Sequence, residues 1–146
     1  MDALFSKDAV GMYARIWEQI QNGGVLTGDA QRIAEAMQEH PEFNSYWLQG
    51  EAAFQPQEID GYVVNPLVHI GLHVAIEKQL ADESPPEIHS VFSALLKTGL
   101  SRHDAIHKIA ALWGDHYFRS VRRGSPIDLM AYVIELAALV PEMPTE

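Results

Sequence analysis

The chain of 146 residues contains no cysteine. Disulfide bonds and thiolate metal sites such as zinc fingers are therefore excluded, and cysteine usage indicates nothing about the redox compartment. Metal ligands, if there are any, must be imidazole or carboxylate groups.

Basic residues are also scarce: ten Lys and Arg stand against twenty Asp and Glu, giving a formal net charge of -10. Duplex DNA and anionic membranes would repel such a chain, so we expect neither nucleic acid nor membrane as a partner. No stretch is long and apolar enough to span a bilayer, and the opening MDALFSKDAV lacks the basic and apolar parts of a secretory signal. The sequence therefore predicts a cytoplasmic protein.

Most established enzyme signatures are missing. A zinc-protease HEXXH motif would need glutamate where Ile70 stands, and the Glu-x-x-His pairs of ferritin-like di-iron bundles do not occur. The chain has no G-x-S-x-G, no P-loop and no dinucleotide glycine pattern. The sequence thus leaves the catalytic residues unknown.

Helical periodicity is what the sequence does contain. Apolar residues recur at helical spacing, and Gly, Pro, Ser and Asn mark the ends of each segment. We expect an all-α protein, a single-domain bundle of six to seven helices over residues 1–146, with no strand and a long connection at 51–64. The predicted helices cover about 7–21, 28–39, 41–48, 66–82, 85–97, 102–123 and 126–140.

The first histidine pair lies in NPLVHIGLHVAIEKQLAD, residues 65–82. Asn65 is a strong N-cap, and Pro66 suits the first helical position, so a helix should begin here. His69 and His73, four residues apart, share one stripe of a helix that is apolar almost all round and therefore central. Buried imidazoles need partners, and one metal ion would satisfy both.

The second pair lies in SRHDAIHKIAALWGDHYFRSV, where Ser101 caps the predicted helix. His103 and His107 share a stripe with Ala110 and Gly114, so we expect this pair to point inward too. If the two helices face each other, four imidazoles converge, and facing helices of a bundle are common places for metal sites.

The predicted site is a transition-metal site with His69, His73, His103 and His107 as ligands. Imidazole suits zinc, iron and nickel, and the sequence does not distinguish these metals. Additional or supporting ligands could come from the flanks of the helices. The candidates are Glu77, Asp104 and His89.

The alternative is that these histidines are hydrogen-bonded core residues, or that the two pairs never meet. A lone inward histidine usually donates to a backbone carbonyl. Two pairs on two apolar faces favour the metal site. We expect His116 to lie on the surface and His40, at a helix break, to be solvated.

The two motifs resemble a family of short bacterial proteins catalogued as a domain of unknown function. Its members share an Asn-Pro-x-x-His-x-x-x-His helix, a Glu-x-Gln step and a later His-x-x-x-His. The resemblance covers most of the chain and implies an all-helical cytoplasmic protein, but it implies no activity. Its pattern falls on Asn65, Pro66, His69, His73, Gln79, His103 and His107.

Two functions from different classes fit this sequence. The first is a helical metalloprotein, in which an open coordination position would support a metal-dependent hydrolase or oxidase. The second is a non-enzymatic interaction module, whose acidic surface binds a protein partner or a second copy and whose histidines only order the core.

Overall fold

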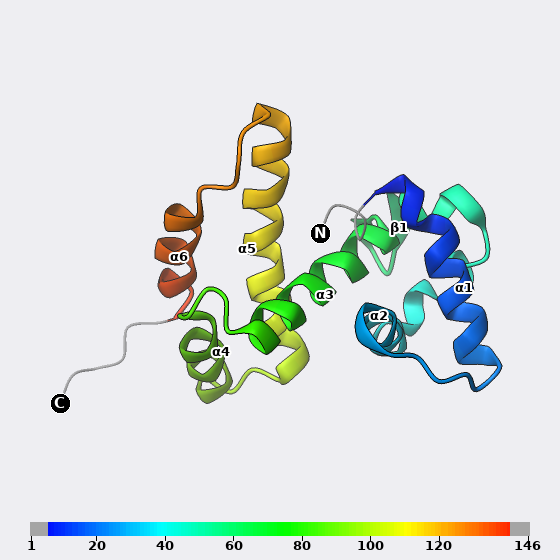
Figure 1. Cartoon of the computed structure of the whole chain (residues 1–146), viewed down its shortest axis with the longest axis horizontal. Coiled ribbons are helices and arrows are strands. Elements are labelled where there is room, and N and C mark those ends of the chain that lie inside the picture. The colour runs from blue at the N-terminus through cyan, green and yellow to red at the C-terminus, as the bar shows by residue number, and fades with distance from the viewer. Residues whose placement is uncertain (1–5, 141–146) are drawn as a thin grey trace. The chain divides into compact units, whose positions relative to one another are not determined.

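A computed structural model describes residues 6–140 of the chain. It confirms the all-α class, since six α-helices, several 3₁₀ helices and one small two-stranded sheet form the described part. Contacts within the chain divide it into two compact units, Met1–Val74 and Ala75–Glu146, here called the N-terminal and C-terminal units. The division falls inside α3, Pro66–Asp82 (Figure 1). One domain over residues 1–146 stays a prediction.

The N-terminal unit is built from short elements joined by tight turns. Its helices agree with the predicted segments, although the segment after Pro41 is a 3₁₀ helix. Its elements are η2 (Lys7–Ala9), α1 (Val10–Gln21), α2 (Gly28–Glu39), η3 (Pro41–Tyr46), η4 (Gly50–Phe54), β1 (Gln57–Ile59), β2 (Tyr62–Val64) and the first half of α3.

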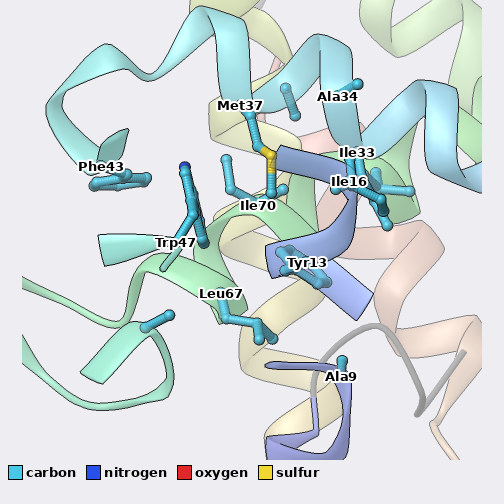
Figure 2. Close-up of a cluster of buried hydrophobic side chains, with 13 residues drawn as sticks. Ala9, Tyr13, Ile16, Ile33, Ala34, Met37, Phe43, Trp47, Leu67 and Ile70 are labelled. Carbon is cyan, nitrogen blue, oxygen red and sulfur yellow. The ribbon is translucent and has the colours of Figure 1, made fainter. Parts of the chain in front are cut away.

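Aliphatic and aromatic side chains together form the core of the N-terminal unit (Figure 2). Tyr13 of α1 and Trp47, which follows η3, are fully buried with ring centroids 5.8 Å apart. Leu67 and Ile70 add the apolar face of α3 to this core. Burying each such side chain contributes roughly 1.5–3 kcal/mol, so α3 is held mainly by packing.

The segment 51–64, which we expected to be a long connection without strands, has regular structure. It contains η4 and an antiparallel hairpin in which Gln57 pairs with Val64 and Ile59 with Tyr62. Asp60 and Gly61 form the two-residue turn with positive φ values of 52° and 87°. Asp-Gly is a preferred pair for such turns, because both positions need φ above zero.

The C-terminal unit packs three helices after the second half of α3. They are α4 (Ile88–Lys97), α5 (Arg102–Arg123) and α6 (Leu129–Ala138). Within this unit, α5 and α6 lie side by side and both contact α4 (Figure 1). None of the helices in residues 6–140 is long and apolar enough to cross a membrane.

Helix starts in the C-terminal unit are partly as predicted. Ser101 accepts a hydrogen bond from the Asp104 amide at 3.1 Å and caps α5, as expected. The last helix begins later than expected, since Asp128, and not Ser125, is its N-cap and accepts from the Ala131 amide at 3.0 Å. α4 also begins later than the predicted segment 85–97, at Ile88.

Candidate metal centre

Asn65 fixes the start of α3, as predicted. Its side-chain oxygen accepts from the Val68 amide at 3.2 Å, and its carbonyl accepts from the His69 amide at 2.9 Å. The cap satisfies one of the amides that the first helical turn leaves without an intrahelical partner. The helical register that begins here places the side chains of His69 and His73 one turn apart on one face.

His69 and His73 meet through their outer ring nitrogens. The two Nε2 atoms lie 3.1 Å apart, and the ring centroids lie 4.8 Å apart. Two nitrogens bound to one ion at about 2.1 Å lie roughly 3.0–3.4 Å apart when the angle at the metal is between octahedral and tetrahedral. The spacing therefore suits two ligands of one ion, as well as a single hydrogen bond between the rings.

His40 is a third imidazole of this cluster, which the sequence did not predict. α2 ends at Glu39, and His40 is its C-cap, because Pro41 follows and the residue before proline disfavours helical geometry. The His40 ring lies 4.6 Å from the ring of His69 and 5.0 Å from that of His73, measured between centroids. The expectation that His40 is solvated is wrong, since only 4% of it is exposed.

Glu42 orients the His40 ring. Its Oε2 lies 2.9 Å from His40 Nδ1, so the neutral ring carries its proton on Nδ1 and its lone pair on Nε2. Partial burial would raise the pKa of the Glu42 carboxyl, but the hydrogen bond to His40, a backbone hydrogen bond and the electrostatic influence of the nearby His40 and His69 rings hold this pKa below its usual value. Carboxylates that bond the far nitrogen of a histidine are typical supports of metal ligands.

Phe43 closes one side of the cluster, and its ring is buried. It stacks on His40 with ring centroids 5.1 Å apart and 7° between the planes, and its centroid lies 5.4 Å from that of His69. An apolar wall beside imidazoles lowers the local dielectric and strengthens electrostatic interactions. The histidine cluster of the N-terminal unit, defined by His40, His69 and His73, is thus a group of three imidazole rings with an apolar wall on one side.

The second predicted pair is arranged differently. In the C-terminal unit, the rings of His103 and His107 lie 6.4 Å apart, with His103 partly buried and His107 exposed. α5 buries a neighbouring face, which includes Ile106 and Ile109. His107 itself is exposed, whereas Ala110 and Gly114 of the same stripe are buried, so the expected inward position holds for these two residues and not for His107. The place of this pair in the ligand set stays a prediction.

The predicted supporting residues have other roles in the C-terminal unit. Arg102 donates to both carboxylate oxygens of Glu77, at 2.6 and 2.9 Å. His89 Nε2 lies 2.8 Å from the carbonyl oxygen of Leu80, the ordinary role of a structural histidine. Asp104 is exposed in the first turn of α5.

Two polar residues of the C-terminal unit are buried against Tyr132. The Tyr132 hydroxyl donates to Gln79 Oε1 at 2.8 Å, which gives Gln79 a structural role. His116 is only 4% exposed and bonds the Glu135 carboxylate, so the prediction that it lies on the surface is wrong. Its position seven residues after buried Ile109 is the signal that could have placed it inside.

Comparison with known proteins gives a family without an activity. The family model described as "Domain of unknown function (DUF1841)" matches residues 6–138. No curated protein and no solved structure matches the chain. Since this family model matches nearly the whole sequence, the chain belongs to the DUF1841 family.

Proposed function

We propose that this protein binds a transition-metal ion through the histidine cluster of its N-terminal unit. The 3.1 Å separation of His69 Nε2 and His73 Nε2 carries the proposal, because it matches the spacing of two ligands on one ion. The nearby His40 ring is a candidate third ligand. A ring nitrogen of His40 lies within 4.8 Å of one on His73, a separation that a bound ion would shorten.

A set of three histidine ligands favours a catalytic metal site over a structural one. Structural zinc sites close their coordination with four protein ligands, whereas catalytic sites keep one position for water or substrate. The finer proposal is therefore a metal-dependent hydrolase or, with iron, an oxidase. In either case Glu42 would position His40, and Phe43 would shield the ligands from water.

Elemental analysis of the purified, untagged protein tests metal binding. We expect about one transition-metal ion per chain after loading with zinc, iron or nickel and removal of the excess. A His69→Ala/His73→Ala variant, which keeps its helical circular dichroism, should bind far less. Clearly substoichiometric metal in the wild-type protein under all three loadings would overturn the proposal and favour the interaction module, whose histidines only order the core.

The sequence also assigns His103 and His107 to the ligand set, and this part stays a prediction. It is tested by a double-mutant cycle of His69→Ala and His107→Ala, read out as metal affinity. Residues that bind one ion are strongly non-additive, so the second substitution should then weaken binding little further. If His107→Ala and His103→Ala each leave the metal affinity unchanged, neither residue is a ligand and the site belongs to the N-terminal unit.

A further inference from the structure

A pocket lies wholly inside the C-terminal unit, between the end of α5 and the start of α6. Its volume is about 320 Å³. Polar and charged side chains dominate its wall, in contrast to the apolar core beside it. The lining residues are His116, Arg119, Ser120, Arg123, Ser125, Pro126, Asp128 and Ala131.

Two arginines give this pocket its charge. Arg119 and Arg123 are four residues apart on α5, so their side chains lie on one face of the helix. Among residues 6–140, neither forms an ion pair with a carboxylate, although the chain has twice as many acidic as basic residues. Arg102 near the start of the same helix, by contrast, is held by both oxygens of Glu77.

Three other polar side chains of the wall already have partners within the unit. His116 bonds the Glu135 carboxylate, and the Ser120 hydroxyl donates to the Tyr117 carbonyl at 2.8 Å. Asp128 accepts from the Ala131 amide as the cap of α6. The two guanidinium groups remain as the strong donors of the pocket, and they outnumber its one carboxylate.

We propose that this pocket binds a small, doubly charged oxyanion, such as the phosphate group of a small molecule. A guanidinium presents parallel N–H donors that match two oxygens of a phosphate or carboxylate, and two guanidiniums together balance a charge of -2. Buried His116, which bonds the exposed Glu135 carboxylate, forms part of the wall. The proposal uses no residue of the histidine cluster and stands independently of metal binding.

A titration with inorganic phosphate, followed by backbone amide chemical shifts, tests this proposal. Sodium chloride keeps the ionic strength constant, and malonate in a parallel arm distinguishes a phosphate site from one that also takes dicarboxylates. We expect saturable shifts confined to residues 116–131. The Arg119→Gln/Arg123→Gln variant should weaken phosphate binding about tenfold or more, because hydrogen bonds to charged groups are strong.

Arg122→Gln is the matched control. Arg122 lies on the same turn of α5 and carries the same charge, but it does not line the pocket. It should change phosphate affinity by less than about twofold, as expected for a screened surface charge. Equal losses in both variants, shifts scattered over the chain, or shifts that chloride alone reproduces would each overturn the proposal.

Discussion

The N-terminal and C-terminal units each carry a pair of histidines four residues apart on a helix, and the two pairs differ in almost every other respect. The rings of His69 and His73 lie 4.8 Å apart, and His73 is 3% exposed. The rings of His103 and His107 lie 6.4 Å apart, and His107 is exposed. The same spacing therefore gives a compact nitrogen pair in one unit and an open pair in the other.

The difference lies in what packs beside each pair. In the N-terminal unit, the end of α2 brings the His40 ring and η3 brings Phe43, so the pair joins a third imidazole and an apolar wall. In the C-terminal unit, α5 buries the face carrying Ile106 and Ile109, so His107 is left at the surface. Spacing within a helix places two side chains together, whereas a ligand cluster needs a third element.

A carboxylate partner alone does not distinguish the two units. Glu42 bonds His40 in the N-terminal unit, and Glu135 bonds buried His116 in the C-terminal unit. His40 has two further imidazole rings within 5.0 Å, whereas the ring near His116 is Tyr132, at 5.8 Å. The two units therefore differ in how many imidazole rings lie close together, and not in whether a histidine has a carboxylate partner.

The largest expected effect is the loss of metal binding in His73→Ala. Removing a ligand from the histidine cluster should lower zinc affinity at least about 100-fold, more than the loss of a supporting residue does. His116→Ala removes an equally buried histidine of the C-terminal unit and should leave zinc affinity unchanged. Calorimetric titration with zinc measures the affinity of both variants. Equal losses of zinc affinity in the two variants would contradict a metal site in the N-terminal unit.

A smaller effect is expected when the support of His40 is removed. Glu42→Gln keeps the size of the side chain but weakens the bond that orients the His40 ring, and should lower zinc affinity about 10- to 100-fold. Glu135→Gln makes the same change beside His116 and serves as the control. If Glu42→Gln has no effect on zinc affinity, His40 does not act as an oriented ligand.

Alkaline pH should weaken both units alike. Burial raises the pKa of Tyr13 in one unit and of Tyr132 in the other, where the hydrogen bond to Gln79 partly opposes the shift. The stabilising contribution is fully present below the unfolded pKa of about 10 and is lost as pH rises toward the folded value. Each tyrosine should lower the free energy of unfolding by about 1 kcal/mol between pH 10 and 11.

Urea unfolding at pH 8, 10 and 11 measures this loss. Tyr13→Phe and Tyr132→Phe should each remove about half of the decline between pH 10 and 11, whatever their effect at pH 8. If one variant removes the whole decline, only one of the two buried phenols resists ionisation.

The smallest expected effect concerns helix starts. Ser101→Ala removes the side-chain acceptor that caps α5 and should destabilise the protein by about 1 kcal/mol. Thr27 precedes α2 in extended conformation but makes no side-chain capping bond. Thr27→Ala should therefore destabilise the protein by only a few tenths of the loss expected for Ser101→Ala. Chemical denaturation compares them, and equal losses would contradict the difference between the caps.

The sequence predicted what local signals determine. The Asn65-Pro66 start of α3 and the Ser101 cap of α5 were predicted correctly, because capping depends on residues within one turn. The hairpin was missed, although Asp60-Gly61 is a recognised turn signal for hairpins. Strands of three residues give too short a pattern for periodicity to detect.

The sequence predicted two of the three histidines in the cluster of the N-terminal unit. Helical spacing gave His69 and His73, since both lie on one helix. His40 is separated from them by about thirty residues, and its burial depends on how α2 and η3 pack against the start of α3, which no local pattern specifies. His116 shows the same limit, because a helical wheel gives a face but not the neighbour that covers it.

The division of the chain inside α3 determines where the protein can be cut. A fragment ending at Val74 would expose the last four carbonyls of a nine-residue helix, with no cap to satisfy them. It would also end one residue after His73. Truncation experiments that aim to isolate the histidine cluster should therefore retain the chain to Asp82, where α3 ends, and accept overlap between the two halves.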